Sequence, residues 1–243
     1  MELLKQDLDA LIKKLPNEND FLLTLESLVS VYPFNEYEYV ISSLLGSGVL
    51  TLDAYYDLRG SYIARNMFMY IFEISAPRTF GESWAQGHLK SLVPALEKPS
   101  RKIDPNYSGQ YDFFLDGQIR IEVKASRAVE AGSEEPLYVK ALAYDSKRPF
   151  WMNFQQIKPG CCDVFVWIAV WRDVIRYWIL SSHEVENHLN YSKGQHRGNT
   201  GEGQFHIRQD NIRLFEDYSV SSDKLADKIR QAYQKEQKLR GKL

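Results

Sequence analysis

The stretch Tyr111–Lys124 (YDFFLDGQIRIEVK) constrains the fold more than any other part of the chain. Its second half alternates strictly between polar and apolar residues, which is the pattern of a half-buried β-strand. The Asp116-Gly117 pair that precedes this half is typical of a hairpin turn. We therefore expect an antiparallel β-hairpin with one polar face and one buried face.

The hydrophobic pattern also predicts how the two strands pair. A two-residue turn would bury the side chain of Asp112 among isoleucines, and burying a lone carboxylate is costly. A three-residue loop, Leu115–Gly117, with Gly117 in the left-handed conformation, pairs Asp112 with Arg120 instead. In this register the apolar residues share one face. The charged residues gather on the other face, and they are Asp112, Arg120, Glu122 and Lys124.

Composition indicates a folded globular protein. Hydrophobic residues make up 44% of the 243 residues and aromatic residues 13%, which suits a packed core. No apolar run reaches the length of a membrane span, and the first residues lack the apolar centre of a signal peptide. The two cysteines, Cys161 and Cys162, are adjacent and suggest neither a disulfide framework nor a zinc site. We expect a cytoplasmic protein with no membrane partner.

Charge is unevenly distributed along the chain. The formal net charge of −2 gives no overall argument for binding a nucleic acid. Residues 1–59 hold ten acidic and four basic residues, whereas residues 221–243 hold three acidic and seven basic residues. If the protein binds a polyanion, the N-terminal region is expected to face away from it. The alternative is that these charges only solvate long helices.

Two regions are expected along the chain. Residues 1–75 are predicted to form an N-terminal helical region that supports the rest or forms a dimer, with helices over Glu2–Leu15, Asn19–Tyr32, Asn35–Leu45 and Thr51–Glu73. Residues 76–243 are predicted to fold as an α/β domain with a mixed sheet of the α+β type. The predicted order there is a helix (Glu82–Leu96), three strands (Tyr111–Leu115, Gln118–Ala125, Leu137–Tyr144), a helix (Pro149–Lys158), two strands (Asp163–Trp171, Val174–Ser181), a short strand (Phe205–Arg208) and a closing helix (Ser222–Arg240).

The carboxylates on the polar face of the hairpin suggest a metal site. Asp112 and Glu122 would repel each other unless a cation lay between them. Oxygen ligands suit Mg²⁺ or Mn²⁺, which retain several waters and accept phosphate oxygens from a substrate. A neighbouring lysine, Lys124, can orient a metal-bound water, help to deprotonate it, and offset negative charge in the transition state. The chemistry that fits is hydrolysis of a phosphodiester.

These residues resemble the signature of a known family. Asp112, followed after nine residues by Glu122, Val123 and Lys124, is similar to the D-x(n)-E-x-K motif of the PD-(D/E)xK nuclease superfamily. Tyr111 stands where that signature has proline. The order predicted for residues 82–171 resembles the restriction-endonuclease-like core of the family, which is a helix, a three-strand meander, a helix and a strand.

The resemblance implies a site and a cofactor. It implies Mg²⁺, for which Mn²⁺ is expected to substitute, held by Asp112, Glu122 and the Val123 carbonyl. It also implies that Lys124 assists the attacking water and that the preceding helix adds a catalytic glutamate, for which Glu82 is the matching position. The alternative is a surface hairpin whose Glu-x-Lys merely forms ion pairs, since strands with alternating Glu and Lys are common. Hairpin register and element order favour the nuclease interpretation.

Two further segments are candidates for DNA contacts. Phe154–Lys158 (FQQIK) falls on a predicted helix that often carries polar residues in the family, and its candidates are Gln155, Gln156 and Lys158. The alternative there is an amphipathic helix that buries its apolar residues. The glycine-rich segment Tyr191–His206 holds residue types that hydrogen-bond to base edges, namely Gln195, His196, Arg197, Asn199 and Gln204. The alternative for this segment is a surface loop or an oligomer contact.

Together these features predict a Mg²⁺-dependent endonuclease that acts on double-stranded DNA and resembles type II restriction endonucleases. No nucleotide-binding motif is present in the sequence, so no nucleotide cofactor is expected. A homodimer is expected, because two strands require two active sites. One alternative is a structure-dependent or non-specific nuclease in DNA repair or phage defence. The other is a non-catalytic DNA-binding module on a nuclease scaffold, which would be expected to lose one of the three motif residues.

Overall fold

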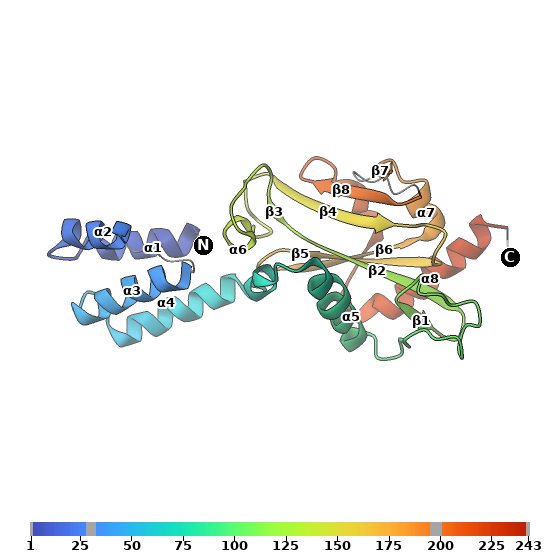
Figure 1. Cartoon of the computed structure of the whole chain (residues 1–243), viewed down its shortest axis with the longest axis horizontal. Coiled ribbons are helices and arrows are strands. Elements are labelled where there is room, and N and C mark those ends of the chain that lie inside the picture. The colour runs from blue at the N-terminus through green and yellow to red at the C-terminus, as the bar shows by residue number, and fades with distance from the viewer. Residues whose placement is uncertain (1, 28–32, 195–200, 242–243) are drawn as a thin grey trace. The chain divides into compact units, whose positions relative to one another are not determined.

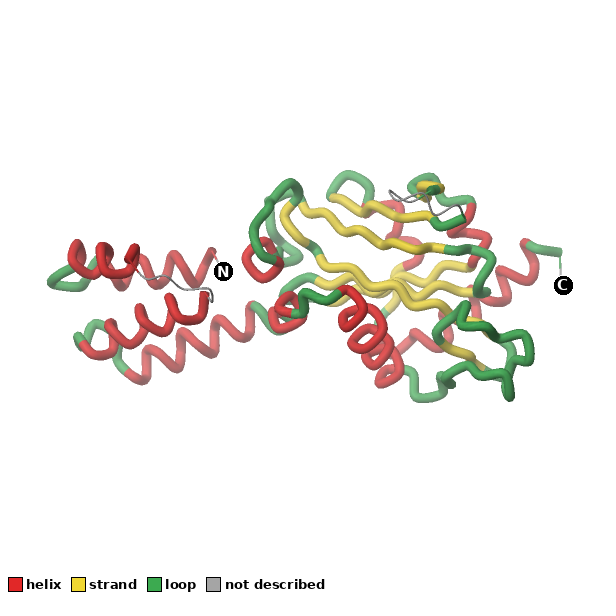
Figure 2. Tube along the Cα trace, viewed as in Figure 1, coloured by secondary structure: helices red, strands yellow, loops and turns green. Residues whose placement is uncertain are grey.

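The computed structural model describes residues 2–27, 33–194 and 201–241, and it divides into two compact units, Met1–Asn66 and Met67–Leu243. Within the described residues, strands occur only in the second unit (Figure 2). No helix of this described part is long and apolar enough to cross a membrane.

The first unit is helical, as the sequence predicted. Its helices are α1 (Glu2–Ile12), α2 (Glu18–Ser27), α3 (Pro33–Gly46) and α4 (Leu52–Arg65). They bury a core of their own, which includes Leu8, Ile12 and Leu44. This unit therefore has the apolar interior of an independent helical bundle.

The prediction of one long helix over Thr51–Glu73 was wrong. Helix α4 ends at Arg65, because Asn66 leaves the helical conformation and its side-chain amide donates to the Tyr62 carbonyl at 2.8 Å. The 3₁₀ helix η1 (Met69–Glu73) follows and buries side chains in the second unit. The boundary between the units accordingly lies at Asn66 and not at residue 75.

The second unit contains two sheets. Sheet A has the strand order β1-β2-β5-β6-β9, in which β2 and β5 are parallel and all other neighbours are antiparallel. Sheet B is antiparallel with the order β3-β4-β8-β7. The strands of sheet A are β1 (Phe113–Leu115), β2 (Ile119–Arg127), β5 (Val164–Val170), β6 (Ile175–Ser181) and β9 (Ser219–Val220), and those of sheet B are β3 (Val129–Glu130), β4 (Phe150–Ile157), β7 (Tyr191–Lys193) and β8 (Gly203–Arg208). The mixed sheet with packed helices confirms the predicted class.

Helices cover one face of sheet A and sheet B covers the other (Figure 1). The covering helices are α5 (Gln86–Leu92), which follows a π-helical turn η2 (Thr79–Ala85), and α8 (Leu225–Leu239). Short helices complete the unit, namely α6 (Leu137–Lys140), α7 (Ser182–Glu186), η3 (Ile212–Tyr218) and η4 (Ser222–Lys224). Sheet A is therefore the middle of three layers.

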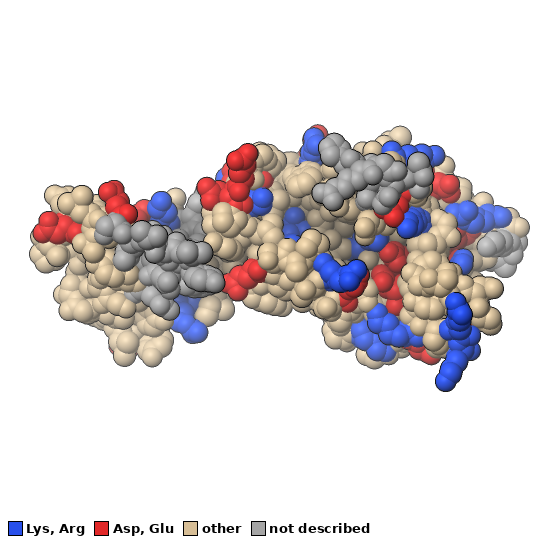
Figure 3. Space-filling model, viewed as in Figure 1, with Lys and Arg blue, Asp and Glu red and all other residues tan. Residues whose placement is uncertain are grey.

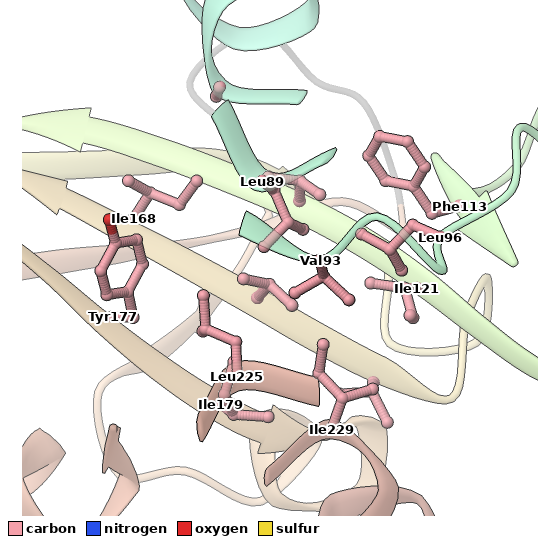
Figure 4. Close-up of a cluster of buried hydrophobic side chains, with 14 of the residues drawn as sticks. Leu89, Val93, Leu96, Phe113, Ile121, Ile168, Tyr177, Ile179, Leu225 and Ile229 are labelled. Carbon is pink, nitrogen blue, oxygen red and sulfur yellow. The ribbon is translucent and has the colours of Figure 1, made fainter. Parts of the chain in front are cut away.

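Strand β5 shows how one sequence serves both cores. Val164, Val166 and Ile168 point into the core beneath α5 and α8, which Figure 4 shows in part. Phe165 and Trp167 point into the core shared with sheet B. Because successive strand residues face opposite sides, a strand covered on both faces is an uninterrupted apolar run.

The predictions for two segments after the hairpin were wrong. The segment Pro149–Lys158, predicted as a helix, contains strand β4, and Leu137–Tyr144, predicted as a strand, contains the short helix α6. A β-bulge lies between Phe154 and Ile157, and Gln156 there has φ +56°. The three-strand meander expected from the resemblance is not confirmed, because β3 pairs with β4 in sheet B and not with the β1–β2 hairpin.

Candidate active site

The hairpin forms with its charged residues on one face, but its register differs from the prediction. Leu115 pairs with Ile119. The three-residue loop is therefore residues 116–118 and not Leu115–Gly117, and Asp112 lies opposite Glu122 rather than Arg120. Gly117 has φ +68°, the left-handed conformation that was predicted for it. A shift by two residues preserves the faces, so the cluster of charges forms as expected.

The carboxylate of Asp112 is held at both oxygens. Oδ2 accepts the backbone N–H of Val123 at 2.8 Å, and Oδ1 accepts the side-chain amide of Gln86 at 2.6 Å. Gln86 begins helix α5, so one donor comes from strand β2 and the other from helix α5. A carboxylate with one donor on each oxygen is fixed in orientation and keeps lone pairs for a further ligand.

Glu122 and Lys124 lie next to this carboxylate on strand β2. Lys124 Nζ is 2.7 Å from Glu122 Oε1, and the two side chains are only 16% and 14% exposed. Both residues occupy positions of β2 on the face toward sheet B, since their partners on β5 are Phe165 and Trp167. The second and third motif residues therefore form a shielded ion pair beside Asp112.

The electrostatics of the two carboxylates, Asp112 and Glu122, favour the binding of positive charge. Burial raises the pKa of Glu122 to about 7; Lys124 opposes this rise and the charge of Asp112 adds to it. Burial likewise raises the pKa of Asp112, against the lowering effects of the Val123 N–H, Lys124 and Lys98. Two interacting carboxylates that are largely shielded from water bind either a proton or a cation more readily than isolated ones.

Glu122 should give the metal-free protein a measurable pH dependence. Its pKa rises from 4.5 to about 7 on folding, so the folded chain binds more protons in this window and loses stability as pH rises through it. We expect the free energy of unfolding by urea in EDTA to fall between about pH 5 and about pH 8. Glu122→Gln should remove this part of the fall, and the exposed control Glu82→Gln should retain it. An unchanged pH profile in Glu122→Gln would place the pKa of Glu122 near its ordinary value.

The donor set fits a hard divalent cation. Asp112 and Glu122 supply carboxylate oxygens, and the carbonyl of Val123 lies on the same strand edge as the N–H that Asp112 accepts. Three oxygens leave room for the waters and substrate oxygens that Mg²⁺ retains. Within the described ranges, no cluster of three or more His, Cys, Asp or Glu side chains offers a denser metal site.

Glu82 does not join this cluster. It lies in the π-helical turn η2, is 61% exposed and pairs with Arg78 at 3.4 Å. Gln86, four residues later, takes the place that Glu82 was expected to fill, because its amide reaches Asp112. The helix before the hairpin thus contributes an amide to the site and not a carboxylate.

Sequence reasoning also missed Lys98, which follows α5 in a loop. Its ammonium donates to the side-chain carbonyl of Gln86 and lies 4.3 Å from the centre of the Phe113 ring. The only local signal was the basic character of this loop, and no motif marks the residue. Lys98 and Gln86 reach Asp112 only through the fold.

Strand β4 brings two of the predicted DNA contacts near the site. The N–H of Asn153 donates to Ser126 Oγ at 3.0 Å, which holds β4 beside β2, two residues beyond Lys124. Gln155 and Gln156 are exposed at the bulge of this strand and not on a helix as predicted. Both glutamines therefore lie on the strand that runs beside β2, which carries Glu122 and Lys124.

The other predicted DNA contacts have different positions. Lys158 is 55% exposed and pairs with Glu202 at 2.8 Å. Gln204 is half-buried on β8. Four more candidates fall outside the described residues, and they are Gln195, His196, Arg197 and Asn199. Basic and acidic side chains lie close together on the face of the second unit that Figure 3 shows.

Comparison with known proteins adds no family to this description. No protein-family model matches the sequence, and the search of curated proteins found no significant match. Function is therefore inferred from the geometry of four residues, Asp112, Glu122, Lys124 and Gln86.

Proposed function

We propose that the protein is a Mg²⁺-dependent endonuclease that hydrolyses phosphodiester bonds in double-stranded DNA. The observation that carries this proposal is that Asp112 lies opposite Glu122 with Lys124 paired to the latter at 2.7 Å. Oxygen donors in this arrangement suit Mg²⁺, or Mn²⁺ in its place. A lysine beside them suits the chemistry of phosphoryl transfer.

Each residue has a distinct role in the proposed reaction. Asp112, Glu122 and the Val123 carbonyl would hold the cation, which when bound supplies charge neutralisation and activation of water. The Val123 N–H and Gln86 keep the Asp112 carboxylate in one orientation. Lys124 Nζ would hold the attacking water or stabilise negative charge on the phosphate oxygens.

The finer proposal is a sequence-specific enzyme that works as a homodimer, as type II restriction enzymes do. It is supported by the exposed amides of Gln155 and Gln156 on the strand beside the candidate site. Glutamine is a residue type that reads adenine edges in the major groove. A homodimer would give one active site to each DNA strand, and light scattering that found the mass of a single 28.3 kDa chain on DNA and in solution would contradict it.

Digestion of a sequenced plasmid tests the function. We expect cleavage with Mg²⁺ and none in EDTA, because the carboxylate pair needs the cation to bind and activate the reacting groups. Discrete bands would support sequence recognition, whereas a smear or nicking would favour a structure-dependent or non-specific nuclease. DNA binding without cleavage under either condition would contradict the proposal and favour a non-catalytic DNA-binding module.

A further inference from the structure

We propose that Lys98 binds a phosphate group of the substrate strand at the candidate active site. This inference rests on the proposed function. It adds a second basic residue, besides Lys124, to the candidate active site. It concerns a lysine that lies outside the hairpin in sequence and joins it through Gln86.

A chain of hydrogen bonds links Lys98 to the carboxylate pair. The ammonium donates to Gln86 Oε1, and Gln86 Nε2 donates to Asp112 Oδ1 at 2.6 Å. The aromatic ring of Phe113, the residue after Asp112, lies 4.3 Å from the same ammonium. An amide oxygen and a ring face hold the side chain in place, and neither carries a formal charge.

The state of the charge distinguishes Lys98 from its neighbours. Lys124 pairs with Glu122 at 2.7 Å, and Lys158 pairs with Glu202 at 2.8 Å. Lys98 is exposed and has no ion-pair partner among the described residues. Its ammonium has three N–H donors, so at least one stays free for an anion after the bond to Gln86.

The position of the Lys98 ammonium suits contact with a phosphate group of the substrate. Lys124 lies at Glu122, and Lys98 lies on the Asp112 side through Gln86. Each of the two carboxylates of the candidate site therefore has a lysine associated with it, directly at Glu122 and through Gln86 at Asp112. A lysine contacts phosphate as a point charge and needs no bidentate geometry.

This role can be tested by measuring the binding of a short fluorescent DNA duplex across about 50–200 mM salt. The logarithm of the binding constant falls with the logarithm of salt concentration, and each lost phosphate contact makes this negative slope shallower by about 0.9. Ca²⁺ would replace Mg²⁺, since it occupies oxygen sites and the readout does not require cleavage. We expect Lys98→Gln to make the slope shallower by about 0.9 and Lys98→Arg to retain the wild-type slope. Lys238→Gln, an exposed lysine on α8, is the matched control and should retain the wild-type slope.

The possible outcomes separate this inference from the proposed function. A wild-type slope in Lys98→Gln, with a lower kcat in the plasmid assay, would overturn the phosphate contact and leave Lys98 as a residue that only orients Gln86. A shallower slope in Lys98→Gln, together with a wild-type protein that never cleaves DNA, would support the phosphate contact and overturn the nuclease proposal. A wild-type protein that binds no duplex would overturn both. Thermal melting of each variant checks that the fold is retained.

Discussion

Replacing Lys124 by methionine should reduce the rate of plasmid cleavage by about 10²–10⁴-fold, the range that a positioned proton-transfer group or charge stabiliser supplies. Methionine keeps the length and apolar stem of lysine and removes only the ammonium. Lys124 lies 2.7 Å from Glu122 and is 16% exposed, so the substitution removes the ammonium that is paired with the carboxylate inside the candidate site. The initial rate of supercoiled plasmid loss with saturating Mg²⁺ measures the effect.

The carboxylate of Asp112 allows a matched version of the same experiment. Asp112→Asn keeps a carbonyl oxygen that can accept the Val123 N–H, but it removes the negative charge that would hold the cation. We expect a loss of rate comparable to that of Lys124→Met. Glu82→Gln makes the same chemical change in a carboxylate that is 61% exposed and should cleave at the wild-type rate. Wild-type cleavage by either Asp112→Asn or Lys124→Met would mean that the site has been placed wrongly.

The largest expected effect on stability comes from Leu89→Ala. Leu89 has no exposed surface and lies in the core between α5 and sheet A (Figure 4). Truncation to alanine in such a core costs about 2–5 kcal/mol through lost burial and a residual cavity. Urea denaturation followed by tryptophan fluorescence would measure the change in the free energy of unfolding.

An exposed leucine provides the control for this variant. Leu189 is 89% exposed, so Leu189→Ala should change the free energy of unfolding by no more than about 0.5 kcal/mol. Leu89 is on the same helix as Gln86, so Leu89→Ala should also loosen the donor to Asp112. Equal stability of the two variants would contradict the assignment of α5 to the core.

The sequence specified the hairpin and its faces but not its register. Alternation has a period of two, so it distinguishes a two-residue from a three-residue loop. It cannot distinguish the predicted loop, Leu115–Gly117, from residues 116–118, because the two differ by a shift of two and expose the same faces. In the observed turn Asp116 takes φ +53° beside Gly117, a conformation that is uncommon for a non-glycine residue and that the pattern of apolar residues does not reveal. Asp112 consequently lies opposite Glu122 and not Arg120.

Strand β4 was mistaken for a helix because of its bulge. Phe150, Phe154 and Ile157 recur at intervals of four and three, which is the spacing of one helical face. The extra residue at the bulge creates this spacing in a strand, and its left-handed Gln156 gives no sign in composition. Proline at position 149 added a false signal for a helix start.

The residues that support Asp112 could not be predicted from the sequence, for a different reason. Gln86 and Lys98 meet the hairpin only through tertiary packing, and no spacing rule connects them to Asp112. The expected partner, Glu82, precedes Gln86 by four residues and lies within the π-helical turn η2, where the helical phase is irregular. A motif identified the two carboxylates and the lysine, whereas the fold determined which neighbours hold them.

Calorimetric titration with Mn²⁺ shows whether the Asp112–Glu122 pair holds a divalent cation independently of any DNA. We predict binding by the wild-type chain, the same affinity in Glu82→Gln, and an affinity lower by more than about 10-fold in Asp112→Asn, since even changes outside the ligand shell cost that much. The same affinity in all three proteins would contradict a metal site at Asp112 and Glu122.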